Sequence, residues 1–208
     1  MRPVPLLRSL LLCAMLTLPA VAASGVPSPS NSTVPFCLLG CPAGDMVITI
    51  VVRDLANNPV TNSTVVLDFS ACPAFTLCPV EPTDPYIYDA PSRTVRAFTD
   101  ASGTVRFPLR AGGVCGTANG VRVFADGVFL AGRTFASPDQ NGDLFVNAVD
   151  QGIASAKLGF ADPTADFDCD GGVTAADLGV VAAHLSHGCS GPTPTRAKSW
   201  GSVKIIYR

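Results

Sequence analysis

The chain has 208 residues, of which 48% are hydrophobic and only 14% are charged, and its formal net charge is −2. The acidic residues are unevenly spread, since residues 137–190 hold eight aspartates and a single lysine, for a local net charge of −7. A nucleic-acid-binding protein needs a basic face. This distribution therefore argues against a nucleic-acid partner and indicates a cation site.

Residues 1–23 have the features of a secretory signal peptide. Arg2 and Arg8 accompany an apolar run that extends from Leu6 to Leu18, and small residues at 20–22 provide a cleavage site. The run is shorter than the ~20 residues that a membrane span requires. A buried N-terminal helix is the alternative. We expect a secreted, extracellular protein, either free or attached to the cell surface, with no transmembrane segment in the mature chain.

The cysteines that follow this segment are expected to be mostly paired, because disulfides persist in exported proteins. Their positions are 37, 41, 72, 78, 115, 169 and 189. Short spacing favours local loops for Cys37 with Cys41 and for Cys72 with Cys78, and Cys115 could join either group. A bond between Cys169 and Cys189 would require a short or kinked helix between them and stays open. An odd number leaves at least one thiol unpaired.

Residues 24–36 are rich in Ser and Pro, which is typical of a flexible linker. Residues 37–136 then read as a series of short strands without a helical period, which predicts an all-β sandwich. The β-branched segments cover 46–54, 63–69, 93–99, 103–109, 120–125 and 127–135. Asp126-Gly127 predicts a hairpin, and 100–103 predicts a turn. Residues 71–91 form a proline-rich loop.

Two stretches of this region resemble bacterial immunoglobulin-like domains of the invasin and intimin type. The residues that carry the likeness are "VVRDLANNPVTNSTVVLDF" and "TDASGTVRFPL", which lie within 47–70 and 94–109. The resemblance implies an immunoglobulin-like β-sandwich that acts as a spacer or an adhesive module and not as a catalyst.

Two acidic stretches farther along, "DQNGDLFVNAVD" (139–150) and "DFDCDGGVTAAD" (166–177), repeat one pattern at an offset of 27 residues. Oxygen-bearing side chains occupy the first, third, fifth, ninth and twelfth places: Asp139, Asn141, Asp143, Asn147 and Asp150, then Asp166, Asp168, Asp170, Thr174 and Asp177. Calcium binds about six to eight oxygens, one of them a backbone carbonyl from the seventh place, here Phe145 or Gly172. The alternative is a solvated turn before each of two helices, but a tandem repeat favours two Ca²⁺ loops. Valines in the eighth place, at 146 and 173, suit an apolar bridge between paired loops.

Helices are expected to follow the loops, over 147–160 and 174–188. The duplicated loop–helix pattern over 137–189 resembles dockerin domains, which are small α-helical modules of paired EF-hand-type units. The resemblance implies protein–protein docking to a cohesin-like domain within a polysaccharide-degrading assembly. The chain departs from the pattern at Leu144, where glycine is usual and Gly171 is present in the second loop. Alanine and valine at 148, 149, 175 and 176 replace the hydroxyl residues of the dockerin docking face.

Other candidate sites are weaker. His184 and His187 are three residues apart and could share a soft metal, but without a Cys or acid in register they read as surface histidines at a helix end. No nucleophile elbow, phosphate loop or HExxH motif is present in the sequence, so an enzyme is not expected. A small glycoside hydrolase would need free paired acids, most of which the calcium loops already use.

Two further alternatives stay open. The protein could be structural or adhesive at the cell surface, with calcium merely stiffening its C-terminal part. The tail, residues 191–208, could be a peptide read by an export or surface-attachment machinery, or a last strand docked on the sandwich.

Overall fold

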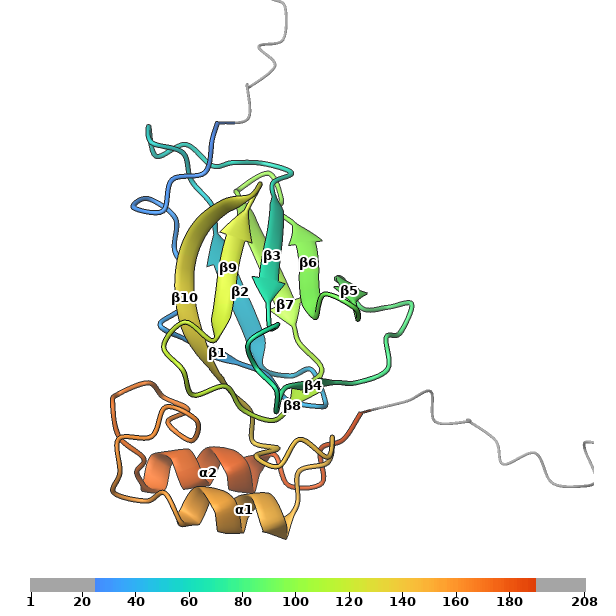
Figure 1. Cartoon of the computed structure of the whole chain (residues 1–208), viewed down its shortest axis with the longest axis vertical. Coiled ribbons are helices and arrows are strands. Elements are labelled where there is room, and N and C mark those ends of the chain that lie inside the picture. The colour runs from blue at the N-terminus through green and yellow to red at the C-terminus, as the bar shows by residue number, and fades with distance from the viewer. Residues whose placement is uncertain (1–24, 190–208) are drawn as a thin grey trace, which may run out of the picture.

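The computed structural model describes residues 25–189 as a β domain with a pair of short helices at one end (Figure 1). The prediction of a mainly β fold is therefore confirmed. The expected signal peptide and the C-terminal tail lie outside the described residues. Within 25–189, no helix is long and apolar enough to cross a membrane.

The larger sheet has six strands in the spatial order β1-β10-β9-β3-β6-β5, and all neighbours are antiparallel except β1 and β10. Its strands are β1 (Cys37–Leu39), β3 (Thr64–Asp68), β5 (Ile87–Asp89), β6 (Thr94–Phe98), β9 (Val121–Ala125) and β10 (Val128–Ala136). A second layer pairs β2 (Val47–Val51) with β7 (Thr104–Pro108), and a small ladder pairs β4 (Thr76–Leu77) with β8 (Ala111–Gly112).

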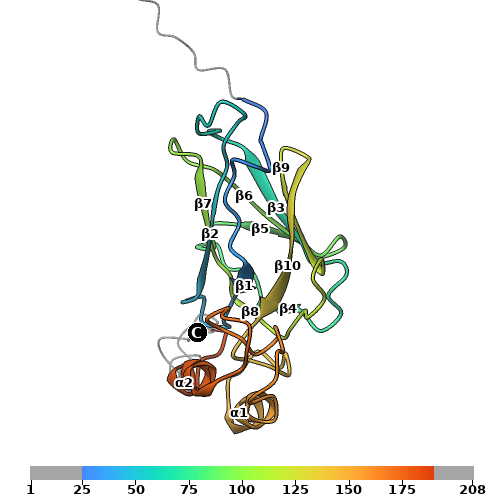
Figure 2. The same ribbon diagram turned by 90° about the vertical axis from the view of Figure 1, so that its left-hand side faces the viewer.

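The side view shows the two layers facing each other (Figure 2), and buried side chains from both form one core. Every second side chain of β2, β3, β6 and β7 is buried, which is the period that a strand with one wet face requires. At the centre, the rings of Phe69 and Phe75 stack with centroids 3.8 Å apart, and Phe135 meets both rings edge-on. The core is therefore shared by strands from both layers.

All six segments predicted as strands form strands, because their apolar alternation is strong. The Asp126-Gly127 hairpin is also confirmed: both residues have positive φ, +46° and +80°, and they join β9 to β10. The turn at 100–103 instead carries the chain from β6 in one sheet to β7 in the other. Strands β1, β4, β5 and β8 were not predicted, since each has only two or three residues.

Residues 25–36 do not form the expected free linker. Thr33 exchanges two backbone hydrogen bonds with Val51, of 2.7 and 3.0 Å, and Ser28 donates its N–H to the carbonyl of Arg53 at 2.7 Å. Because β2 pairs with β7 on one side only, its other edge is free to receive this segment. The Ser/Pro composition conceals the pairing, which is made by backbone groups.

The disulfides differ from the local loops that short spacing favoured. Cys72 pairs with Cys115 inside the β domain, whereas Cys37–Cys169 and Cys78–Cys189 join the β domain to the helical module, and Cys41 is free and buried. The local pairs Cys37–Cys41 and Cys72–Cys78 are therefore wrong, whereas Cys115 does join one of the two groups. The bond Cys169–Cys189, which the sequence left open, does not form. Cys37 stands on the strand beside β10, which leads directly into the module, so its nearest partner is distant in sequence.

Peptide mapping without reduction is expected to recover these three pairs. Replacing Cys78 and Cys189 together by Ser opens a link between residues 111 positions apart, so the free energy of unfolding in urea should fall by about 2–5 kcal/mol. A Cys37–Cys41 or Cys72–Cys78 peptide in the map would contradict the arrangement.

Candidate metal centre

Two short helices, α1 (Ala148–Ser155) and α2 (Ala175–Ala183), each begin inside an acidic loop. Asn147 and Thr174 cap them, accepting hydrogen bonds from the N–H groups of Val149 at 2.7 Å and Ala176 at 3.1 Å. Asp150 and Asp177 complete each capping box by accepting from the backbone N–H of the capping residue, both at 2.8 Å. The helices are shorter than the predicted 147–160 and 174–188, because the chain turns away after 156 and 184.

The first-place carboxylates fold the loops around themselves. Asp139 accepts hydrogen bonds from the N–H groups of Gly142 at 2.8 Å and Leu144 at 2.7 Å. Asp166 accepts from the N–H groups of Asp170 at 3.2 Å and Gly171 at 2.9 Å. In each loop, a backbone amide of the sixth place thus points at the first acid, and the chain wraps the carboxylate.

Both loops also share an unusual backbone conformation. The fourth and sixth places have positive φ in each: +74° and +69° at Gly142 and Leu144, and +63° and +101° at Cys169 and Gly171. Leucine and cysteine rarely adopt this conformation, since it crowds Cβ against the backbone. The two loops therefore take the same turn although they have different residues at these places. Because Leu144 stands where glycine is usual, its backbone is strained.

The acids at the ends of each loop are buried, whereas the Asn or Asp side chains of the third and fifth places are exposed. Asp139 and Asp150 are 0% exposed, and Asp166 and Asp177 are 7% and 1% exposed. Hydrogen bonds connect the ends, since Asp150 accepts from the N–H of Gln140 at 2.8 Å and Asp177 accepts from the N–H of Phe167 at 2.6 Å. Two carboxylates are thus held together, away from water, in each loop.

The electrostatic cost of this arrangement is visible in the pKa values. Burial raises the pKa of Asp139 above its ordinary value, and the charges of Asp150 and Asp143 raise it further against the two backbone hydrogen bonds. The pKa of Asp168 is also raised, by desolvation and by the neighbouring acids. At Asp177, burial opposes ionisation, but hydrogen bonds from the backbone of Thr174, Phe167 and Asp168 outweigh it and lower the pKa. A cation placed among these groups would relieve the repulsion.

Among residues 25–189, the predicted carboxylates converge as a group of three in the second loop but not in the first. In the second loop, carboxylate oxygens of Asp166, Asp168 and Asp177 lie within 4.8 Å of one another. In the first loop, Asn141 donates its side-chain N–H to Asp143 at 2.9 Å. The carbonyl of Phe145 accepts from the Asn147 side chain at 3.2 Å. The remaining predicted ligands, Asp170 and Gly172, meet through a backbone N–H to carboxylate bond of 3.1 Å.

The eighth-place valines are buried in one apolar cluster, as predicted, while the backbone of each pairs with the segment after a helix. Val146 exchanges backbone hydrogen bonds with Ser186 and His187 after α2, both of 2.8 Å, and Val173 does so with Gly159 and Phe160 after α1, at 2.8 and 2.9 Å. The two sets of partners are again 27 residues apart. Each loop therefore hydrogen-bonds to the segment that follows the helix of the other loop–helix unit. The repeat seen in the sequence is thus also present in the contacts between the two units.

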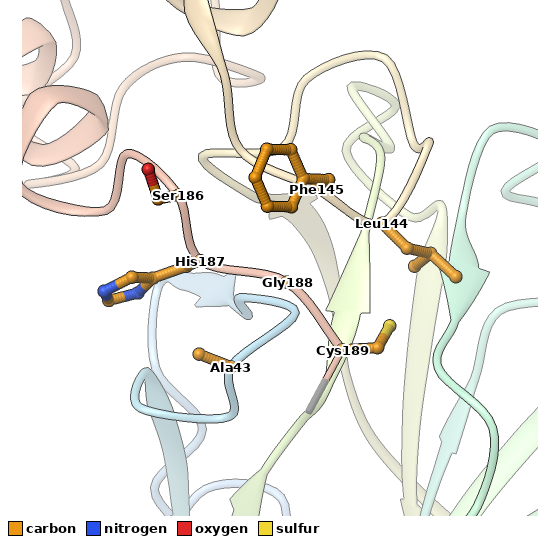
Figure 3. A pocket seen from close by; sticks show the side chains of 7 residues that line it. All are labelled: Ala43, Leu144, Phe145, Ser186, His187, Gly188 and Cys189. Carbon is orange, nitrogen blue, oxygen red and sulfur yellow. The ribbon is translucent and has the colours of Figure 1, made fainter. Parts of the chain in front are cut away.

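A second group of side chains, the interdomain cluster, comprises Cys41, Asp45, His184 and His187. Treating the two histidines as unaccompanied surface residues was wrong, because Cys41 and Asp45 reach them from the segment between β1 and β2. The cluster could not be recognised from the sequence because its two halves are far apart along the chain. The odd number of cysteines was the one sequence feature that pointed to it. Figure 3 shows His187 beside Ala43 of that segment, at the edge of a pocket of about 550 Å³.

The strain at Leu144 provides a test of the loop geometry. Leu144→Gly should raise the free energy of unfolding by roughly 0.5–1 kcal/mol, because relief of the left-handed conformation outweighs the added flexibility of the unfolded chain. The reverse change at the matched position, Gly171→Ala, should lower it by about 1 kcal/mol or more. Urea unfolding with the disulfides intact measures both. Equal losses in the two variants would contradict the shared geometry.

Comparison of the chain with protein-family models, with curated proteins and with solved structures finds no significant match. The acidic loops, their helices and the interdomain cluster therefore have to be interpreted through their own chemistry.

Proposed function

We propose that this is an exported, non-catalytic calcium-binding protein in which the loops 139–150 and 166–177 each bind one Ca²⁺. The observation that carries the proposal is the pair of buried carboxylates, at the first and twelfth places, that both loops hold in the same hydrogen-bonded frame. Burying two like charges together is unfavourable unless a cation compensates them. The three disulfides are consistent with an extracellular setting.

The ligand chemistry favours calcium over other metals. Each loop offers carboxylate, amide or hydroxyl, and backbone carbonyl oxygens, and the ligands come from a continuous stretch of twelve residues. Calcium accepts many oxygens in an adaptable geometry, whereas zinc prefers nitrogen and sulfur and magnesium requires a strict octahedron. The exposed third and fifth places leave room for solvent ligands in a larger coordination sphere.

Calcium would act on the fold of the module. Asp150 and Asp177 are ligand candidates and also cap the helices, so a cation that fixes these carboxylates also fixes the first turn of α1 and α2. The calcium-loaded module would then present its helices to a protein partner. On the basis of the dockerin resemblance, we propose that this partner is a cohesin-like domain in a polysaccharide-degrading assembly. The module exposes large apolar side chains for such a contact, at 145, 149, 158, 160 and 185. The β domain, as an immunoglobulin-like sandwich, would serve as a spacer.

One observation favours a second function, a structural or adhesive role in which calcium stiffens the C-terminal part. Two disulfides, Cys37–Cys169 and Cys78–Cys189, fasten the module to the β domain. A module that only docks does not require such a fixed attachment. Binding of a cohesin to the whole chain, compared with binding of cell surfaces or glycans, separates the two functions.

The metal assignment is tested by calcium titration of the full chain in a calorimeter, with circular dichroism alongside. The full chain is needed because Cys169 and Cys189 have their partners in the β domain. Two Ca²⁺ ions should bind, and Asp139→Asn and Asp166→Asn should each remove one of them. At a free calcium concentration of 100 times Kd, each site should raise the free energy of unfolding by about 2.7 kcal/mol.

The control is Asp89→Asn, which neutralises an exposed acid in β5 and should leave both binding events unchanged. Helix content and stability that do not respond to calcium would mean that the acids only cap helices and close turns, and the proposal would fail.

A further inference from the structure

The interdomain cluster brings together four side chains of a different chemical class from the calcium loops. Cys41 and Asp45 lie between β1 and β2, His184 caps the C-terminal end of α2, and His187 follows three residues later. One potential ligand atom from each side chain lies within 4.8 Å of the others. Sulfur and imidazole nitrogen are the ligands that zinc prefers, and calcium does not.

The distances agree with a tetrahedral centre. Sγ of Cys41 lies 3.8 Å from Nδ1 of His187. Oδ2 of Asp45 lies 3.1 Å from the same nitrogen and 3.6 Å from Nε2 of His184. A zinc ion with ordinary bond lengths holds tetrahedral N and O ligands about 3.3 Å apart, and S and N ligands about 3.6 Å apart. The measured separations therefore leave space for one such ion with little movement of the side chains.

The surroundings orient the ligands as they do in metal sites. Nδ1 of His184 lies 2.7 Å from the carbonyl oxygen of Val180, so this nitrogen carries the proton and Nε2 is left as the ligand atom facing Asp45. The rings of His184 and His187 meet nearly at right angles, 79°, and so direct different edges towards the cluster. A backbone hydrogen bond thus sets the nitrogen that His184 offers, and Nδ1 is the His187 nitrogen that lies beside Cys41 and Asp45.

Cys41 is the cysteine that forms no disulfide among the described residues, and it is fully buried. A buried thiol is a poor partner for disulfide exchange, because the exchange needs an accessible thiolate. Burial raises the pKa of Cys41 to about 12, against a hydrogen bond from the backbone N–H of Ala43. The sulfur therefore stays protonated on its own, and a bound metal would displace the proton to solvent as the metal–sulfur bond forms.

An ordinary ion pair explains less of this arrangement. Asp45 would need only one histidine, and neither a second imidazole nor a buried thiol would have to converge on it. The repeat also argues against a role of the two histidines in calcium binding. In the first loop–helix unit, the positions that correspond to His184 and His187 hold Lys157 and Phe160. The histidines are present only in the unit whose helix exit faces the β1–β2 segment.

We propose that Cys41, Asp45, His184 and His187 form a zinc site that cross-links the β domain to the end of α2. All four ligands come from the protein, which is the pattern of a structural site and not of a catalytic one. None of its ligands belongs to the acidic loops, so zinc and calcium would occupy separate sites. It would add a third link between the two parts of the molecule, in the segment after α2 that the Cys78–Cys189 disulfide also anchors.

The chain contains only two histidines, which makes a direct test possible. The full chain is labelled with ¹⁵N-histidine, kept in excess calcium and titrated with ZnCl₂. Both imidazole spectra should change together and saturate at one equivalent of zinc, with Nε2 of one ring and Nδ1 of the other becoming metal-bound. A single affected ring, or no change at one equivalent, would overturn the proposal without any variant having to fold.

Cobalt(II) provides the second measurement, because a thiolate bound to it gives a charge-transfer band and a tetrahedral site gives intense visible bands. Both should appear at one equivalent of cobalt, and the charge-transfer band should vanish in Cys41→Ser. His184→Ala and His187→Ala should weaken zinc binding at least 100-fold, whereas Leu185→Ala, an exposed neighbour, should not. Equal affinity in the histidine variants, or a six-coordinate cobalt spectrum, would show that the cluster is only a hydrogen-bonded network.

Discussion

The arrangement of the helical module depends on how Asp139 is fastened to the β domain. Its backbone carbonyl accepts a hydrogen bond of 2.7 Å from Gly113, and its carboxylate lies against Gly112 of β8, where a Cβ atom would come within 1.8 Å of the Asp139 Oδ2. Only glycine allows this approach. Because Asp139 comes three residues after the end of β10, the first acid of the first loop is positioned by the sheet itself.

This attachment makes the two chemically similar loops unequal. The first loop lies against the β domain, with Gly142 close to the carbonyl of Ala74, whereas added Cβ atoms at Gly171 and Gly172 in the second loop would meet open space. The first loop therefore starts from a frame that is largely fixed before any ion arrives. The second loop depends more on its own hydrogen bonds and on the disulfide at Cys169. Two loops of similar sequence thus form two sites that differ in how closely the β domain packs against them.

Much of the fold could be predicted from local patterns. The alternation of apolar residues located six strands, and Asp126-Gly127 located a hairpin, because these features depend on neighbours in sequence. The ligand candidates of both loops were likewise visible, since their spacing is local. The short strands, the packing of residues 25–36 and the disulfides escaped prediction because each depends on a partner far along the chain. The interdomain cluster escaped for the same reason: Cys41 and His187 are 146 residues apart.

The Cys78–Cys189 bond also constrains the order in which the molecule can be completed. A chain emerges from the ribosome beginning at its N-terminus, and domains commonly fold as soon as they are available. Here β1 has to wait for β10, and Cys37 and Cys78 have to wait for partners that appear at positions 169 and 189. The β domain therefore cannot reach its final oxidised form as an early, self-sufficient unit. The pairing of Cys37 and Cys78 therefore has to follow the synthesis of the helical module, which supplies their partners.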